Sequence, residues 1–326
     1  MINNLQFFVS NTCDPYHNLA VEKLLFDTVA PETLILYLWQ NKNTVVIGKN
    51  QNAFSECRTE LLKQEGGLLA RRLSGGGAVF HDLGNLNFTF LCSTDNLNIP
   101  KHIDVIREAC RLAGIETELS GRNDILANGR KFSGNAFYNS KGHSYHHGTI
   151  LIDADMDKLG RYLTPPKAKL ESKGIQSVRS RVINLTELAP TLTPETMKQR
   201  LLDALETVYS LVPTAASSPD EKKTAELARR FADREYLLGS PIPFNVSFEG
   251  RMPFGHAELK LCVENGVIVS ARLYTDALDT EFSTTVENTL LSLPFDLPII
   301  SDSLVRVLND ADALALITLL AEQIFI

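Results

Sequence analysis

The sequence predicts an α+β protein of two domains, with mixed β-sheets in a larger first domain and a small α+β domain after it. The chain has 326 residues, which is longer than one typical domain. Helical and strand-like apolar patterns alternate along it. A segment at 212–223, rich in Pro, Ala, Ser and charged residues, is typical of a linker. We therefore expect domains at residues 1–211 and 224–326.

Local patterns give the expected elements in order. Helices are expected at residues 18–29, 103–113, 194–209 (with Thr193 as its N-cap) and 310–326. Strands are expected at 33–39, 44–48, 78–80, 86–91, 148–153, 244–248, 257–263 and 267–274. The tight turn between 78–80 and 86–91 predicts that these two strands form a hairpin. Asn128-Gly129 and Asn265-Gly266 indicate two further hairpin turns.

Composition and charge are those of an ordinary globular protein. Hydrophobic residues make up 44% and charged residues 22%, and the formal net charge is −7 with a pI near 5.6. This charge argues against a nucleic-acid binder that relies on a global basic field. The N-terminus shows no secretory or transit pattern, and no apolar run is long enough to cross a bilayer. We expect a cytoplasmic protein with no nucleic-acid or membrane partner.

The cysteines argue against a disulfide framework or a zinc site. Their number is odd and no two form a C-x-x-C pair; they are Cys13, Cys57, Cys92, Cys110 and Cys262. We expect reduced, buried thiols. Cys92 and Cys110 lie in apolar strand and helix segments, which favours core packing over nucleophilic chemistry.

A basic, glycine-rich segment at 71–82 (R-R-L-S-G-G-G-A-V-F-H-D) is the most informative stretch. Three consecutive glycines let backbone amides approach an anion, and two arginines add planar forks suited to phosphate or carboxylate. A basic surface loop without a ligand is the alternative. The spacing matches neither the Walker loop nor the G-x-G-x-x-G dinucleotide motif, so any nucleotide must be held by another scheme.

Asp124 and Lys131 form a second candidate cluster. They lie on either side of the Asn128-Gly129 turn, where both side chains would face a common site across a hairpin. A lysine there could neutralise charge on an α-phosphate while holding the carboxylate that attacks it. A solvated hairpin tip is the alternative.

Two other patterns are weaker. His146 and His147 are adjacent on a strand, so they point to opposite faces and do not chelate one ion. Ser74, His81 and Asp82 are the residue types of a hydrolase triad, but no G-x-S-x-G elbow is present.

Several ordered motifs together closely resemble the lipoate–protein ligase A family of biotin/lipoate ligases. They are residues 71–90, G-R-N-D at 121–124, G-R-K-F-S-G-N-A at 129–136, H-H-G-T-I-L-I-D at 146–153 and K-G-I-Q-S-V-R-S-R-V-I-N-L at 173–185. D-P-Y-H-N-L-A-V-E at 14–22 and V-V-I-G-K-N-Q-N at 45–52 are similar too. A weaker likeness, which includes Y-T-D-A-L at 274–278, continues in the second domain.

The resemblance implies a biotin/lipoate ligase-type catalytic domain and a two-step reaction. Lipoate first attacks the α-phosphate of ATP to give lipoyl-adenylate, and a carrier-domain lysine then displaces AMP. The cofactors implied are ATP and Mg²⁺. The implied carriers are E2 subunits of 2-oxoacid dehydrogenases and the glycine cleavage H protein, and a monomer is expected.

The resemblance also assigns roles to single residues. Lys131 matches the lysine that contacts both lipoate and the α-phosphate, and it is the expected catalytic residue. Asp124 matches a polar group near Mg²⁺. The expected ATP and adenylate contacts are Arg72, Gly77, Ala78, Val79, Phe80, Asn85, Asp124, Lys131, Ser133, His147 and Arg179. The expected lipoate contacts are Arg72, Ser74, Gly75, Gly76, His81 and Lys131.

Two departures from the family pattern affect the shape of the pocket more than its chemistry. Leu73 replaces a residue that is usually small or polar, and Phe137 stands where a polar residue or Tyr is frequent, which leaves the acyl-chain preference undecided. The alternatives are a biotin ligase, an octanoyl or lipoyl transferase that works without ATP, and a non-catalytic protein that binds lipoylated carriers. The biotin-type G-R-G-R-x-x-R pattern is absent.

Two segments are expected to close over the adenylate. Residues 74–77 and 172–181 combine small residues with Arg and Lys, which suits folding over an anion. Closure would keep water from the mixed anhydride. The second domain would then swing on the 212–223 linker to admit the carrier lysine.

Overall fold

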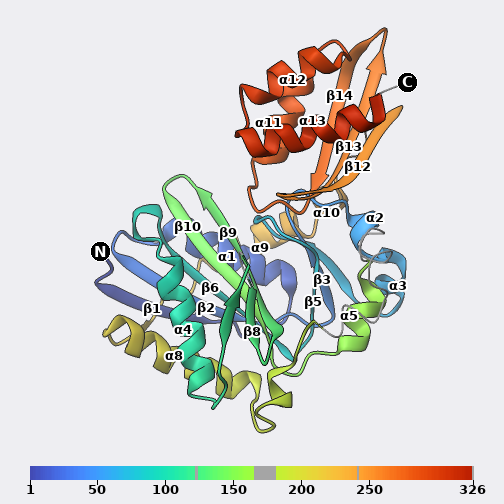
Figure 1. Cartoon of the computed structure of the whole chain (residues 1–326). Helices are drawn as coiled ribbons and strands as arrows, with labels where there is room; N and C mark the ends of the chain where they lie inside the picture. The colour runs from blue at the N-terminus through green and yellow to red at the C-terminus, as the bar shows by residue number, and fades with distance from the viewer. Residues whose placement is uncertain (122–123, 165–180, 241, 325–326) are drawn as a thin grey trace. The chain divides into compact units, whose positions relative to one another are not determined.

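The structure is a computed structural model that describes residues 1–121, 124–164, 181–240 and 242–324 (Figure 1). The chain forms two compact units. The first contains Met1–Val46, Cys57–Arg71 and Val79–Leu237, and the second contains Ile47–Glu56, Arg72–Ala78 and Leu238–Ile326. The glycine-rich segment after Arg71 thus belongs to the same unit as the C-terminal residues.

The first unit is built on an eight-stranded mixed sheet. Its order is β11 (Thr214–Ala215), β1 (Asn4–Val9), β2 (Thr33–Trp39), β6 (Asn85–Ser93), β10 (His143–Leu151), β9 (Arg130–Ser140), β8 (Asp124–Ala127) and β7 (Glu118–Ser120). β1 runs parallel to β2 and β11, and the other pairs are antiparallel. Mixed sheets combined with helices confirm the predicted α+β class.

Helices cover both faces of this sheet, which explains why β2 and most of β6 are fully buried. On one face, α4 (Ile99–Arg111) and α8 (Pro194–Tyr209) lie side by side and pack on residues such as Leu36 and Phe88 (Figure 1). On the other face, α1 (Pro15–Thr28) packs on β10, where the Phe26 and Tyr145 ring centroids are 5.6 Å apart. α9 (Glu221–Phe231) lies along α1.

Local signals in the sequence set several boundaries. Thr193 caps α8, accepting a hydrogen bond from the Thr196 amide. Asn128 and Gly129 both have positive φ, at 50° and 69°, as a type I′ hairpin turn requires. Further elements of the first unit are α3 (Thr59–Gln64), β4 (Leu68–Arg71), β5 (Val79–His81), the 3₁₀ turns Thr94–Asn96 and Leu185–Glu187, and α5 (Met156–Tyr162).

The predicted hairpin between strands 78–80 and 86–91 is wrong. β5 pairs with β3 (Thr44–Ile47) in a separate sheet of order β4-β3-β5, whereas β6 lies between β2 and β10. The turn between them is held elsewhere: the Asp82 carboxylate accepts from the Asp155 amide at 2.7 Å, and the Gly84 carbonyl accepts from the Asp153 amide at 2.9 Å. These bonds to the segment after β10 hold the turn in place where the chain passes from the β4-β3-β5 sheet to the eight-stranded sheet.

The second unit contains a three-stranded antiparallel sheet with helices packed on one side (Figure 1). Its elements are α2 (Ala53–Glu56), β12 (Val246–Met252), β13 (Gly255–Glu264), β14 (Val267–Thr275), α11 (Phe282–Leu290), α12 (Leu297–Val305) and α13 (Asp310–Ile324). α10 (Arg234–Leu238) ends where this unit resumes. The Asn265-Gly266 hairpin turn is present, with φ of 50° and 77°.

The segment expected to be a linker contains regular structure. Within 212–223, β11 pairs in parallel with β1, and α9 begins at Glu221. Residues as far as Leu237 fall in the first unit. The domain division at 212–223 stays a prediction. Among the described helices, none is both long and apolar enough to cross a membrane.

Two histidines stack in the core of the first unit. His102 of α4 and His146 of β10 are fully buried, with ring centroids 5.5 Å apart. Burial lowers the pKa of His102 to about 3. Burial, together with His102 and His147, also lowers the pKa of His146 well below its ordinary value. Both rings are therefore neutral in the folded protein near neutral pH.

We expect this stack to weaken the folded state in acid. Below the ordinary histidine pKa of 6.5 the unfolded chain binds a proton at His102, whereas the folded chain does so only near pH 3. Stability therefore falls as the pH drops through this window. The free energy of unfolding can be measured in urea at several pH values between about pH 7 and pH 5. In His102→Phe, its decrease with falling pH should be smaller than in wild type by up to about 1.4 kcal/mol per pH unit. His17→Phe is the control. If the free energy of unfolding of His102→Phe depends on pH as that of wild type does, His102 is not the group responsible.

Candidate functional site

A lysine and an aspartate face each other across the β8–β9 hairpin, as the sequence predicted. The Lys131 Nζ lies 2.6 Å from the Asp124 Oδ1, and the two side chains are 37% and 34% exposed. The strand register places Lys131 opposite Leu126 and Asp124 opposite Gly134. A cation and an anion are thus held together at a partly open position, which leaves the ammonium accessible to a second anion.

The backbone of Lys131 is fixed on both sides. On the side away from β8, its amide donates to the Arg181 carbonyl at 2.7 Å, and its carbonyl accepts from the Ile183 amide at 2.9 Å. Arg181 is the last residue of the basic 172–181 segment, and the rest of that segment, including Arg179, lies outside the described residues. The position of the lysine therefore does not depend on its ion pair alone.

Gly134 leaves room for the lysine side chain. A β-carbon at Gly134 would lie 2.9 Å from the Lys131 Nζ and 3.0 Å from its Cε. The ammonium therefore lies over the Gly134 backbone. On the neighbouring strand, a β-carbon at Gly148 would lie 2.6 Å from the Gly134 carbonyl oxygen. The two glycines allow close packing around the catalytic candidate.

Two buried asparagines of β6, Asn85 and Asn87, lie on the same face of the sheet as Lys131. Asn87 pairs across the strands with Thr149, whose Oγ1 accepts from the Gly134 amide at 3.4 Å. The Asn85 Nδ2 donates to the Asn87 Oδ1 at 2.9 Å, and the two residues are 0% and 1% exposed. Among the described residues, Asn85 Oδ1 and Asn87 Nδ2 have no hydrogen-bond partner. This leaves one acceptor and one donor, suited to a polar substrate group.

A buried acid in α1 was missed by the sequence analysis. The Glu22 Oε1 lies 2.9 Å from the His147 Nδ1 and accepts from the Thr89 hydroxyl at 2.7 Å. The Trp39 indole donates to the Thr89 hydroxyl at 3.1 Å. Glu22 is 1% exposed, and its position three residues after Leu19, on the apolar stripe of the helix, was the signal that marked it. Its contact orients the predicted His147.

Ser133 does not join this group. The Lys131 side chain lies over Gly134, so Ser133, the residue just before Gly134, points to the opposite face of the strand. It pairs with Ile125 of the core, is fully buried, and its hydroxyl has no hydrogen-bond partner within the described residues. Its predicted contact with the nucleotide stays a prediction.

The β5 residues occupy different settings. The His81 Nδ1 lies 3.2 Å from the Asn41 Nδ2, and its ring forms a T-shaped pair with Trp39, with centroids 6.1 Å apart. Phe80 is buried against Tyr162, with ring centroids 5.4 Å apart, which is core packing. Val79 and Ala78 are half-buried.

The glycine loop, residues 72–78, lies in the second unit and is held by its own arginine. The Arg72 Nη2 donates to the carbonyls of Gly75 and Gly77, both at 2.8 Å, and its Nε donates to the Ser74 hydroxyl at 3.1 Å. Arg72 and Ser74 are buried, whereas Gly77 is exposed. In this structure the guanidinium therefore organises the loop, and its predicted contacts with lipoate and ATP stay predictions.

Arg71 has a structural role in the first unit. Its Nη2 donates to the Leu237 carbonyl at 2.6 Å and its Nε to the Tyr236 carbonyl at 3.0 Å. These carbonyls lie at the C-terminal end of α10, where a cation is favourable. Arg71 thus binds backbone carbonyls in this structure, and the prediction that it binds a phosphate or carboxylate stays a prediction.

Three of the cysteines are inert by their surroundings. Burial raises the pKa of the Cys57, Cys92 and Cys110 thiols to about 12, so they remain protonated near neutral pH. All five cysteines are free thiols. The expectation that all of them are buried is wrong for Cys13, which lies exposed just before α1.

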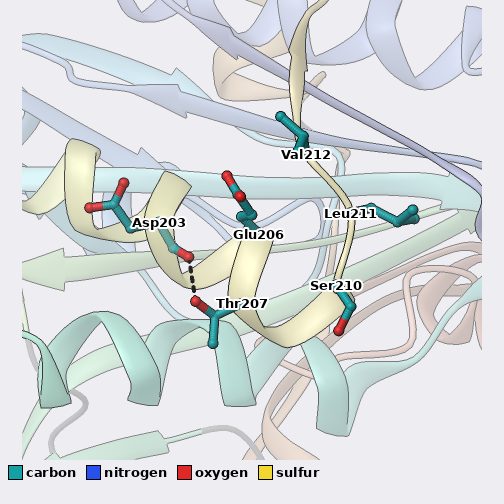
Figure 2. Close-up of a pocket in the computed structure, with 6 residues that line it drawn as sticks. All are labelled: Asp203, Glu206, Thr207, Ser210, Leu211 and Val212. Carbon is teal, nitrogen blue, oxygen red and sulfur yellow. Dashed lines mark hydrogen bonds between the residues drawn. The ribbon is translucent and has the colours of Figure 1, made fainter.

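An open hollow of about 550 Å³ lies elsewhere in the first unit, at the C-terminal end of α8 (Figure 2). Asp203, Glu206, Thr207, Ser210, Leu211 and Val212 line it. The Thr207 hydroxyl donates to the Asp203 carbonyl of the helix at 2.9 Å. Its charged residues are acids, so it does not suit an anionic substrate, and none of the predicted site residues lines it.

Two family descriptions match the chain. The lipoyl protein ligase A/B catalytic domain matches residues 14–206, and the bacterial lipoate protein ligase C-terminus matches residues 242–319. Lipoate-protein ligase A of Psychrobacter cryohalolentis is 37% identical over 302 residues, covering 90% of this chain and 89% of that protein. Lipoate-protein ligase A of Bdellovibrio bacteriovorus is 38% identical over 286 residues, covering 85% and 84%.

Solved structures show the same similarity. P. falciparum LipL1 in complex with lipoate has a TM-score of 0.85 and 29% identity, with 98% of this chain and 100% of that chain covered. A bipartite lipoate protein ligase from Thermoplasma acidophilum, described with its E2 lipoyl domain, has a TM-score of 0.63 and 25% identity, with 76% and 100% covered. A lipoate-protein ligase A bound with ATP has a TM-score of 0.61 and 25% identity, with 73% and 99% covered. The chain therefore belongs to the lipoate–protein ligase A family of enzymes, as its motifs predicted.

Proposed function

We propose that this enzyme uses ATP to activate lipoate as lipoyl-AMP and then transfers the lipoyl group to a lysine of a carrier domain. The observation that carries the proposal is Lys131, an ammonium paired with Asp124 on a backbone bonded on both sides, within the residues that match the catalytic domain. Relatives solved with lipoate and with ATP support both substrates.

In the first step, a carboxylate oxygen of lipoate bonds to the α-phosphorus of ATP while the bond to pyrophosphate breaks. Both reacting groups are anionic, so the Lys131 ammonium would reduce their repulsion and stabilise the negative charge that grows in the transition state. Asp124 would keep the ammonium aimed at the site. The donor and acceptor left by Asn85 and Asn87 would hold a polar substrate group on the same face of the sheet.

Mg²⁺ fits this site as an ion that arrives with ATP. Such ions usually bind one or two protein carboxylates together with phosphates and water. Asp124 is the candidate carboxylate, because it is partly exposed beside the Lys131 ammonium. The ion would shield the triphosphate charges.

In the second step, the ε-amine of a carrier lysine attacks the acyl carbon of the mixed anhydride, the acyl–oxygen bond breaks and AMP leaves. We propose the lipoyl domains of E2 subunits and the glycine cleavage H protein as carriers, and a monomeric enzyme. The T. acidophilum ligase described with its E2 lipoyl domain supports the first of these carriers.

A transferase that works without ATP would need a nucleophilic thiol. The raised pKa values of Cys57, Cys92 and Cys110 argue against that role for these three. The glycine loop and Lys131 also suit an ATP-dependent reaction better than a non-catalytic carrier-binding protein.

Pyrophosphate release tests the proposal directly. We expect the enzyme to release pyrophosphate from ATP only when lipoate is present, and lipoyl-AMP should appear by mass spectrometry. Adding an E2 lipoyl domain should convert the adenylate to AMP and a lipoylated domain, whereas a domain with its acceptor lysine replaced by alanine should not react. Transfer from an acyl-carrier thioester in the absence of ATP, with no lipoate-dependent pyrophosphate, would replace the ligase by the transferase.

A further inference from the structure

Within the second unit, the glycine loop packs against residues 275–281, which include most of the Y-T-D-A-L motif. The Gly76 amide donates to the Ala277 carbonyl at 3.3 Å. A β-carbon at Gly75 would lie only 2.1 Å from the same oxygen and 2.8 Å from the Leu278 carbonyl oxygen. The absence of a side chain at Gly75 is therefore required by this internal contact, whether or not an anion is bound.

A second set of bonds joins the same segment to residues 47–56. The Asn50 Nδ2 donates to the Thr280 carbonyl at 3.0 Å, and the Thr275 amide donates to the Asn50 carbonyl at 2.9 Å. The Lys49 amide in turn donates to the Ser74 carbonyl at 2.9 Å. The glycine loop is thus held directly through Gly76 and indirectly through Lys49 and Asn50.

Thr275 holds the turn that leads into Ala277. Its Oγ1 accepts from the Ala277 amide at 3.1 Å, and the two residues are 3% and 2% exposed. This short turn fixes the peptide group between Asp276 and Ala277, directly before the carbonyl that accepts from Gly76. Without the hydroxyl, a buried amide would lose its partner, which disfavours the present geometry.

We propose that residues 275–281 are a positioning element for the glycine loop, with Thr275 and Asn50 as its positioning residues. Consecutive glycines have the greatest backbone freedom, so a loop that must present amides to an anion gains affinity when other contacts order it first. The affinity for the carboxylate of lipoate and the phosphates of ATP would therefore depend on this segment. The inference rests on the proposed function of the loop.

The test compares hydroxyl loss with hydroxyl retention at one position. Thr275→Val keeps the shape and removes the acceptor, whereas Thr275→Ser keeps the acceptor. Thr289→Val is the matched control, because it removes a hydroxyl that bonds the Thr285 carbonyl within α11 of the same unit. For each protein, calorimetry with lipoate alone gives Kd, and pyrophosphate release gives the KM for ATP and kcat.

We expect Thr275→Val to raise the Kd for lipoate or the KM for ATP by about fivefold or more, with a smaller change in kcat. Thr275→Ser and Thr289→Val should stay within about twofold of wild type. If Thr275→Val does not fold, Asn50→Asp, which loses the donor to Thr280, should raise the Kd or the KM in the same way, with a smaller change in kcat. The inference is overturned if a folded variant of either kind keeps both constants within twofold. Failure of the wild type to bind lipoate would instead reject the proposed function.

Discussion

Lys131→Ala is expected to lower lipoate-dependent pyrophosphate release by on the order of 10²–10³, because it removes the cation placed between two anionic reactants. The fold should be retained: the side chain is 37% exposed, and the backbone bonds to Arg181 and Ile183 do not involve it. Initial rates at saturating ATP and lipoate give the comparison. Lys158→Ala is the control, since it removes an exposed lysine of α5 in the same unit.

Lys131→Ala must also remain folded for this comparison to report on catalysis. Circular dichroism and the midpoint of thermal unfolding should match those of wild type, so that lost activity reflects lost chemistry. Pyrophosphate release near the wild-type rate by folded Lys131→Ala would reject Lys131 as the catalytic residue. A comparable loss in Lys158→Ala would show that the assay reports general destabilisation.

Gly134→Ala is expected to lower kcat by between about tenfold and a hundredfold, since a displacement of about 1 Å at a reacting group has effects of this size. The added methyl group would lie 2.9 Å from the Lys131 Nζ, so the ammonium must move. Stability should change little, because the displaced atoms are the flexible end of a side chain. Gly160→Ala in α5, where the new carbon would point into open space, is the matched control.

A double mutant shows whether Gly134 acts through Lys131. If it does, Lys131→Ala with Gly134→Ala should be no slower than Lys131→Ala alone, since no ammonium remains to be displaced. Additive losses in the double mutant would mean that Gly134 affects the reaction by another route. Normal turnover by Gly134→Ala would show that the ammonium tolerates the shift.

Most individual elements follow from short-range signals. The Thr193 cap, the two Asn-Gly turns and the apolar run of β2 each have their cause within a few residues, and all are present in the structure. The facing of Asp124 and Lys131 is of the same kind, because one tight turn between adjacent strands sets it. The motif resemblance added the family, which the comparisons confirm.

Strand partnership and side-chain direction did not follow from such signals. Strict alternation along β9 would place Lys131 and Ser133 on the same face, but the irregular register beside Ile125 places Ser133 on the other face. The turn after His81 resembles a hairpin turn, yet hydrogen bonds from Asp153 and Asp155 hold it instead. Both outcomes depend on partners that local spacing does not identify.

The sequence alone therefore determined the family, the α+β class, most of the helices and strands and the Lys131–Asp124 pair, because each rests on neighbouring residues or on an ordered set of motifs. Only the tertiary structure decided that Glu22 contacts His147, 125 residues away in the chain, and that the glycine loop packs on Ala277. Such contacts depend on how distant segments come together to bury apolar surface and pair buried polar groups. That requirement acts on the whole fold and leaves little trace in local spacing.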